Sequence, residues 1–376
     1  MNPHTDQERM LADAAKQFAD SEHTSVRLRA CRDRRPDFDR SVWQRIAALG
    51  WLGVLVAEED GGLGAGCGDM AQLVYAWGRA CAPEPLVATG VLAARTLVHA
   101  DGPARARLLE GLVSGVLVPA LAAHAGDTLA HTAAQMHATP AGSGHRLSGL
   151  ARYVVPADAD GFIVAAGNAS GNQLFWVAAD AKGLAIHHER RADGSAAARL
   201  TLDAVAVESS DLVAGAQTAD AALARATDEA LVLTAVEMAG MMRAMLDLTL
   251  EYLRTRVQFD KPIGSFQALQ HRTVDLYVAE QLARDVAQAA CTALDAGVEA
   301  NERALIASRA KARACASLDR IAREAVQLHG AIGYTDEYAL GAYVNRTLVM
   351  ASWLGNANAH RRRYAHLAPP FEVLSA

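Results

Sequence analysis

A positively charged side chain lies close to two amides and an aromatic ring in segment 256–270, RVQFDKPIGSFQALQ. Arg256 follows a long run of apolar residues at helical spacing, and a cation at the end of a helix complements the helix dipole. A guanidinium can also bind a phosphate through its fork of N–H groups, here with Phe259 and the amides of Gln258 and Gln267 nearby. These residue types therefore allow either an ordinary helix end or a phosphate-binding site.

The chain is predicted to turn directly after this arginine. Pro262 cannot donate a backbone hydrogen bond and disfavours helical geometry at Lys261, so the preceding helix must end here. Apolar residues at helical spacing over 231–253 and 267–296 predict two long helices. Arg256 is thus expected at the junction of two helices.

A second segment with chemical potential is 327–331, QLHGA, at the end of another predicted helix over 303–329. Gly330 suits the left-handed cap of a helix, which explains the glycine without any ligand. His329 is isolated, and a lone histidine is more often a packed or surface imidazole than a catalyst. Because no cluster of His, Cys or carboxylate residues has the spacing of metal ligands, no metal site is predicted.

Segment 256–267 resembles the motif Arg-x-Gln-Phe-Gly-x-Pro-Ile-x-x-Phe-Gln of the acyl-CoA dehydrogenase flavoproteins, with Asp260 in place of the glycine. Segment 327–331 is similar to that family's Gln-x-x-Gly-Gly motif, with Ala331 in place of the second glycine. The resemblance implies that FAD is the cofactor. It also implies a set of residues that bind FAD: Arg256, Gln258, Phe259, Gln267, Gln327, Gly330 and Ala331.

The family removes the α-proton of an acyl-CoA thioester with a carboxylate while the flavin takes a hydride from the β-carbon. The resemblance also implies electron-transfer flavoprotein or a similar acceptor as a partner. Leu354 stands where most members have the catalytic glutamate. Glu229 and Glu237, on the helix before Arg256, are displaced candidates, although each is more often a solvated or ion-paired helix carboxylate. The catalytic residue is therefore unassigned.

A third departure concerns the family motif Thr-Glu-Pro-x-x-Gly-Ser-Asp, which wraps the flavin ring and is replaced here by ALAAHAGD at 120–127. In this family the ring lies in the cleft of one subunit, and the arginine and glutamine motifs reach it from the neighbour. Together with Arg346 and segment 235–240, the pattern resembles the bacterial branch of sterol side-chain breakdown, often built from two different subunits. The resemblance implies a homo- or hetero-oligomer, either a dimer or a tetramer.

Three regions must position these motifs. Residues 1–115 are predicted to form an N-terminal helical domain, and residues 216–376 a helical bundle of four helices. Between them, over 116–215, short β-prone runs alternate with Gly, Asn and Asp turns and predict a small β barrel or sandwich. Thr227 or Asp228 is expected to cap the first long helix of the bundle. This α+β layout matches the acyl-CoA dehydrogenase architecture.

Composition excludes several classes of protein. The chain has 376 residues, of which 51% are hydrophobic, so it can bury a large core. A net charge of −6 provides no basic surface for nucleic acid. Five scattered cysteines argue against a disulfide framework and indicate a reducing compartment. With neither a signal peptide nor a membrane span evident, a cytoplasmic protein is predicted.

Three functions are compatible with these observations. The first is an FAD-dependent acyl-CoA dehydrogenase for a bulky or ring-bearing thioester, acting alone or as one subunit of a heteromeric enzyme. The second is a non-catalytic partner that completes a flavin site in another chain. The third is a flavoprotein of the same fold with different chemistry, since fold alone does not select a reaction.

Overall fold

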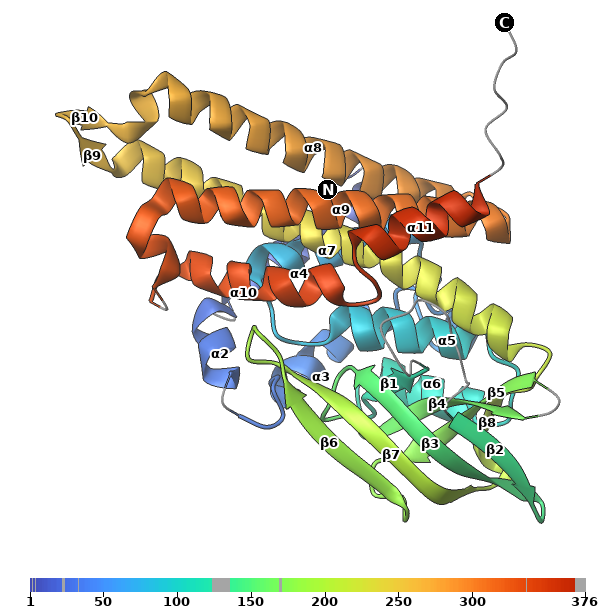
Figure 1. Ribbon diagram of the computed structural model, residues 1–376. Coiled ribbons are helices and arrows are strands. Elements are labelled where there is room, and N and C mark those ends of the chain that lie inside the picture. Colours follow the sequence, from blue (N-terminus) through green and yellow to red (C-terminus); the bar gives the residue numbers. More distant parts are fainter. Residues whose placement is uncertain are drawn as a thin grey trace, which may run out of the picture.

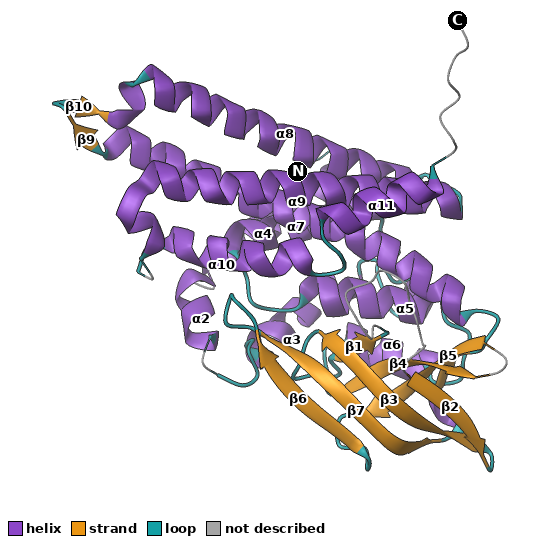
Figure 2. Cartoon of the chain, viewed as in Figure 1, coloured by secondary structure: helices purple, strands orange, loops and turns teal. Residues whose placement is uncertain are grey.

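Helices and strands are segregated in the computed structural model, with the large sheet of the middle part gathered below the long helices (Figures 1 and 2). The structure describes residues 1–368 apart from residues 2, 4, 22, 23, 33, 124–135, 169, 170 and 336. The predicted α+β architecture is confirmed. Of segment 120–127, which replaces the ring-binding motif, residues 124–127 lie outside the described residues.

The N-terminal part is helical, as predicted. Trp43 and Ile46 lie on one face of α3 and are completely buried, which is the reason that this short segment packs as a helix. Asp39 caps α3 by accepting a hydrogen bond of 2.8 Å from the Ser41 amide. The elements are α1 (Asp6–Ser21), α2 (Thr24–Cys31), α3 (Arg40–Ala48), α4 (Cys67–Ala80), the π-helical turn η3 (Leu86–Ala93), α5 (Ala94–Val98) and α6 (Arg105–Val113).

The middle part is a sheet of eight strands whose order is β6-β7-β3-β2-β4-β5-β8, with β1 paired to β4. Alternate residues of β7 are buried, so one face of the sheet covers a second hydrophobic core. The strands are β1 (Pro119–Ala122), β2 (Met136–Ala141), β3 (Gly144–Val154), β4 (Gly161–Asn168), β5 (Gly171–Ala178), β6 (Leu184–Arg190), β7 (Ala196–Val207) and β8 (Leu212–Ala214).

Three long helices and two shorter ones form the C-terminal part: α7 (Ala219–Thr255), α8 (Gln267–Asp295), α9 (Ala300–His329), α10 (Ala339–Ser352) and α11 (Ala357–Leu367). The predicted cap at Thr227 or Asp228 is wrong, because α7 begins eight residues before Thr227, at Ala219. Both residues are buried inside the helix. Asp228 instead forms ion pairs with Arg303 and Arg363, which join α7 to α9 and α11.

Contacts between the parts hold the sheet against the helices. Arg40 of α3 donates two hydrogen bonds to the carboxylate of Asp160, at 2.8 and 3.0 Å, in the turn before β4. Such a paired geometry fixes orientation as well as distance. Asp295, at the end of α8, accepts hydrogen bonds from the backbone amides of Cys67 and Gly68 and so caps α4.

The described residues also bear on redox state, metal binding and membrane insertion. All five cysteines are buried and carry free thiols. Within the described ranges, no three His, Cys, Asp or Glu side chains gather in a way that could hold a metal ion. None of the described helices combines the length and the apolarity needed to cross a membrane.

Candidate functional site

The predicted junction between the two long helices contains a small antiparallel hairpin that the sequence did not reveal. Strands β9 (Val257–Gln258) and β10 (Lys261–Pro262) pair with Gln258 opposite Lys261. The turn between them consists of Phe259 and Asp260, whose φ angles are +55° and +64°. A two-residue turn of this kind needs positive φ at both positions, which glycine adopts at least cost and aspartate tolerates. Asp260 therefore fits the turn at the position where the family motif has glycine.

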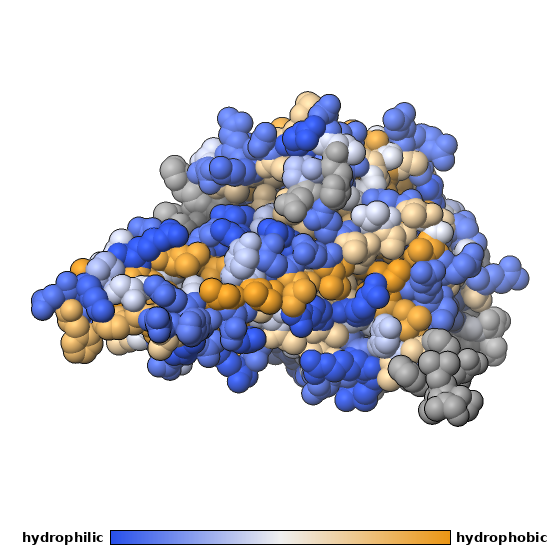
Figure 3. All heavy atoms as spheres, turned by 90° about the horizontal axis from the view of Figure 1, so that it is seen from above, coloured by the Kyte–Doolittle hydropathy of each residue, from blue (hydrophilic) through white to orange (hydrophobic). Residues whose placement is uncertain are grey.

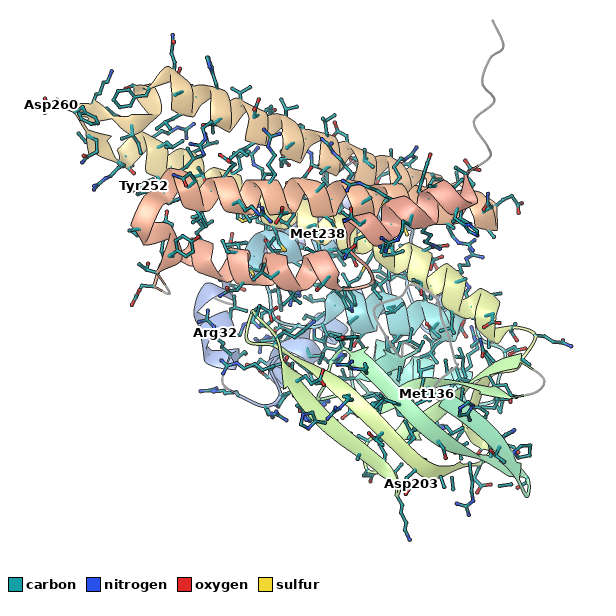
Figure 4. All side chains as sticks on the ribbon, in the orientation of Figure 1. Arg32, Met136, Asp203, Met238, Tyr252 and Asp260 are labelled. Carbon is teal, nitrogen blue, oxygen red and sulfur yellow. The ribbon has the colours of Figure 1, made fainter. Side chains whose placement is uncertain are left out.

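The candidate residues of this motif are exposed around the hairpin. Phe259 is 85% exposed, and Arg256, Gln258 and Gln267 are also exposed. The backbone of Arg256 is held at both ends, because its amide donates to the Tyr252 carbonyl and its carbonyl accepts from the Ile263 amide. Figure 4 shows Asp260 at the outer end of the hairpin, far from the sheet. The guanidinium of Arg256 is thus presented outward on a fixed backbone.

The second motif lines an open groove between α9 and α10 with a volume of about 470 Å³. Gln327, Gly330 and Ala331 all contribute to its wall, together with Arg323 of α9. The φ angle of Gly330 is +66°, and a methyl group added at Gly330 would meet no atom within 4 Å. The glycine therefore leaves open space at the mouth of the groove. Arg256, Gln258, Phe259 and Gln267 do not belong to the groove's lining.

Two rings connect the two motifs. Tyr252, one turn before Arg256, stacks on His329 with 4.6 Å between ring centroids and 28° between planes. The imidazole also contacts the Ala325 carbonyl through Nδ1, at 2.7 Å, and the Tyr338 hydroxyl through Nε2, at 3.2 Å. Burial lowers the pKa of His329, so the ring is neutral near pH 7. His329 is thus a packed imidazole, as the sequence favoured.

Leu354 lies in a tight bend between α10 and α11. Its φ angle is +55°, an uncommon conformation for a residue with a branched side chain. The bend is fixed by His360, whose Nε2 donates to the Leu354 carbonyl at 2.9 Å, and by Asn356, which caps α11. Burial, reinforced by the charge of Lys311, lowers the pKa of His360 to about 3, so the imidazole is neutral. The bend holds a side chain that cannot accept a proton.

Glu229, one of the two displaced candidates for the base, belongs to a buried ion-pair cluster. Its carboxylate accepts two hydrogen bonds from Arg95, at 2.5 and 3.1 Å, and one of 3.2 Å from Arg225. Burial alone would raise the pKa of Glu229, but His99 and Arg95 outweigh it and lower the pKa to about 2. A carboxylate whose pKa is about 2 is a weak proton acceptor near neutral pH. The geometry therefore makes Glu229 a structural residue.

Glu237, the other candidate, faces a small pocket where the three parts of the fold meet. Its Oε1 accepts a hydrogen bond of 3.2 Å from Arg346 of α10. The second nitrogen of the same guanidinium donates to Asp193, in the turn between β6 and β7, at 2.9 Å. The pocket beside this cluster has a volume of only about 30 Å³. Sequence reasoning missed Asp193, since nothing local marks a residue 153 positions from its partner.

Comparisons with known proteins agree with this geometry. Residues 5–116 match the acyl-CoA dehydrogenase N-terminal domain, and residues 220–367 match the acyl-CoA dehydrogenase C-terminal domain. The chain is 32% identical over 342 residues to acyl-CoA dehydrogenase IpdE2 of Mycobacterium tuberculosis. The aligned region covers 90% of this chain and 89% of that protein.

Two solved structures share the whole architecture. A variant of the steroid ACAD Tcur3481-Tcur3483 superposes with a TM-score of 0.85 at 31% identity and covers 96% of this chain and 97% of that one. The ChsE4-ChsE5 complex from Mycobacterium tuberculosis gives a TM-score of 0.87 at 25% identity, with coverage of 97% and 98%. The predicted family is thereby confirmed, and the chain belongs to the acyl-CoA dehydrogenases, FAD-dependent oxidoreductases that act on acyl thioesters.

Proposed function

We propose that this chain is one subunit of a heteromeric acyl-CoA dehydrogenase. In this assembly it binds the pyrophosphate and adenosine half of an FAD whose ring pocket and catalytic carboxylate belong to the partner chain. The observation that carries the proposal is Leu354. By the resemblance, Leu354 stands where the family has its base; it lies in a tight bend, and the two other candidate carboxylates are in buried ion pairs.

The nucleotide half of the cofactor fits the exposed residues of this chain. Arg256 offers a guanidinium to the pyrophosphate, and Gln327, Gly330 and Ala331 offer a groove wall to the adenosine. The open space at Gly330 is consistent with close approach of a ligand to the backbone. Bound FAD would supply hydride acceptance, whereas the residues of this chain would hold and orient the nucleotide.

Assembly with another chain is supported by the surface of α8. Four of its apolar side chains are about half exposed and lie at helical spacing: Val274, Tyr277, Val278 and Leu282. Figure 3 shows an apolar band across the face that contains α8. A continuous apolar surface of this kind is typical of a protein interface. A different chain as partner, rather than a second copy, is favoured because two copies would supply no carboxylate at position 354.

The relatives suggest the substrate class. One similar structure is described as a steroid ACAD, and another as a complex of ChsE4 with ChsE5. By analogy, the acyl group is a bulky, ring-bearing thioester from sterol side-chain breakdown, and electron-transfer flavoprotein or a similar protein reoxidises the flavin. We also propose that the protein is cytoplasmic. The chain is proposed to divide into three parts, with boundaries at residues 115 and 215.

The decisive experiment compares the chain purified alone with the chain co-expressed with a homologue from a neighbouring gene. Flavin content is measured by absorbance after denaturation, and activity by anaerobic bleaching with an acyl-CoA. We expect a nearly colourless protein alone and a yellow, acyl-CoA-reducible complex. A chain that retains a full complement of FAD by itself and bleaches with a thioester would instead be a complete enzyme.

A further inference from the structure

Three aromatic side chains from three helices form a ring cluster, which consists of Tyr252, His329 and Tyr338. His329 is the last residue of α9, Tyr252 lies one turn before the end of α7, and Tyr338 directly precedes α10. Tyr252 lies toward the end of the bundle that carries the hairpin (Figure 4). The ring of His329 stacks on Tyr252 and lies 5.2 Å from the ring centroid of Tyr338, at an angle of 55°. Ring pairs at such distances prefer a defined geometry, so the cluster fixes how the three helix ends meet.

Two hydrogen bonds fix the orientation of the imidazole at the centre of the cluster. Nδ1 of His329 lies 2.7 Å from the Ala325 carbonyl, which can only accept, so Nδ1 carries the proton and donates. Burial lowers the pKa of His329, so Nε2 remains unprotonated near pH 7. The Tyr338 hydroxyl therefore donates to Nε2, at 3.2 Å. The imidazole is held in one tautomer and one orientation.

His329 and Tyr338 stand at the two ends of the segment that carries the second motif. The structure describes this segment, 330–337, except for residue 336. It begins with the 3-10 helix η7 (Gly330–Tyr334). Three residues of η7 line the groove between α9 and α10: Gly330, Ala331 and Tyr334. Gly333 is buried against the cluster, because a methyl group added there would lie 3.1 Å from Cβ of His329. His329 thus supports this wall of the groove from below and at both ends.

The ring cluster is also connected to Arg256 through the backbone. The amide of Arg256 donates to the carbonyl of Tyr252 at 2.9 Å, so the residue that stacks on His329 also holds the last turn of α7. The Arg256 carbonyl accepts from the Ile263 amide at 2.8 Å, which ties the hairpin to the same turn. A continuous series of contacts therefore runs from Arg256 through Tyr252 and His329 to η7.

We infer that His329 is a positioning residue for the nucleotide half of FAD, and that it sets the span between the Arg256 guanidinium and the groove at Gly330. A dinucleotide is bound well only when the distance between its phosphate and adenosine contacts is fixed in advance. Because only 3% of its surface is exposed, His329 acts through Tyr252 and η7 rather than by touching the ligand. The inference rests on the proposed function and deepens it, since it names the residue that makes the two motifs one site.

The first test is a double-mutant cycle, because a path of contacts shows coupling only when the energies are not independent. The dissociation constant for FAD is measured by flavin fluorescence in the complex of this chain with its partner. We expect His329→Ala to weaken FAD binding by about tenfold. In the His329→Ala background, the factor lost on Arg256→Ala should be at least about threefold smaller than in the wild type. Losses that multiply independently would overturn the inference.

The same cycle separates this inference from the proposed function. If Arg256→Ala binds FAD as tightly as the wild type, the proposed function is wrong and the inference falls with it. If Arg256→Ala weakens binding and His329→Ala does not, the proposed function stands and the inference alone is wrong. A purely structural role would lower the melting temperature of His329→Ala without changing the FAD affinity of the folded protein, which would also contradict the inference.

Conservative variants cover the case in which His329→Ala does not fold. Tyr252→Phe keeps the ring that stacks on His329, whereas Tyr252→Ala removes it. We expect Tyr252→Phe to bind FAD like the wild type and Tyr252→Ala to bind about threefold to tenfold more weakly. Tyr338→Phe removes only the hydroxyl that donates to Nε2 and should also weaken binding by about threefold. Equal affinities for Tyr252→Phe and Tyr252→Ala would overturn the inference.

Tyr364→Ala is the control for removal of an aromatic ring. Tyr364 is 39% exposed on α11, which is tied to the first half of α9 by a hydrogen bond from Arg363 to Ser308. Its loss should leave FAD affinity unchanged. A loss of affinity as large as that of Tyr252→Ala would show a general effect of removing a tyrosine and would contradict the inference.

Discussion

Tyr252 and His329 stack face to face, with their ring centroids 4.6 Å apart, and so join the end of α7 to the end of α9. Tyr252 precedes Arg256 of the first family motif by one helical turn, and His329 belongs to the second motif, directly before Gly330. The contact fixes the relative position of the exposed guanidinium and the groove at Gly330. Arg256 and Gly330, which are 74 positions apart in the sequence, are thus brought into one region of the fold.

Replacing Arg256 should weaken FAD binding without unfolding the chain. The guanidinium is exposed and no described contact of the fold depends on it, so the melting temperature of Arg256→Ala should equal that of the wild type. Loss of a charged hydrogen-bond pair to pyrophosphate should weaken FAD binding by about tenfold to a hundredfold. The dissociation constant of the complex for FAD, measured by flavin fluorescence, gives the answer.

Arg254→Ala is the matched control, because Arg254 is an exposed arginine of the same helical turn that lies outside the motif. It should leave FAD affinity unchanged. Equal losses in the two variants would indicate a general charge effect rather than a specific phosphate contact.

Restoring a carboxylate at position 354 should restore little activity. The bend and its anchors, His360 and Asn356, are intact, so Leu354→Glu would place a carboxylate at the family's position. The family's ring-binding motif is nevertheless replaced by ALAAHAGD at 120–127, so a carboxylate alone does not complete the site. We expect no acyl-CoA bleaching above that of Leu354→Gln, which has the same size without an ionisable group. A large gain for the glutamate variant alone would mean that only the base was absent.

The Glu229 cluster should make the free energy of unfolding depend on pH in the acid range. The pKa of Glu229 in the folded chain is about 2, below its ordinary value of 4.5, so its ionised form stabilises the fold above about pH 4.5. This contribution, on the order of 3 kcal/mol at neutral pH, is lost as the pH falls toward 2. Urea unfolding of the wild type and of Glu229→Gln should differ most at pH 7. The difference between the free energies of unfolding of the two proteins should narrow to about half at pH 3.

A gap between the two proteins that stays constant from pH 7 to pH 3 would contradict the assignment of this acid dependence to Glu229. Glu324→Gln is a suitable comparison, because its partner Arg272 is substantially exposed and the pair should contribute little at either pH.

Asp295 should stabilise the packing of α8 on α4. Its two carboxylate oxygens accept from the amides of Cys67 and Gly68, at 2.6 and 2.9 Å, where the helix dipole favours a negative charge. Asp295→Ala should therefore lower the free energy of unfolding by about 1–2 kcal/mol, and Asp295→Asn by less. Chemical denaturation with circular dichroism measures both. Identical stabilities for the three proteins would show that solvent replaces this cap.

Sequence patterns predicted the long helices well, because their stability comes from apolar stripes that are visible in one dimension. The start of α7 was misplaced since Thr227 looks like a cap, whereas the alanine-rich segment before it continues the helix. The hairpin at Phe259 and Asp260 was missed because this dipeptide is not a usual turn sequence. The family motif pointed to this segment without revealing its conformation.

The sequence by itself determined that position 354 carries no proton acceptor and that Arg256 follows a family pattern, because the identity of a side chain does not change on folding. Only the tertiary structure decided that Asp193 meets Arg346 and so joins the β6–β7 turn to α10. Contacts of this kind join residues from separate elements. Their distances depend on how helices and strands pack, and local sequence carries no record of that packing.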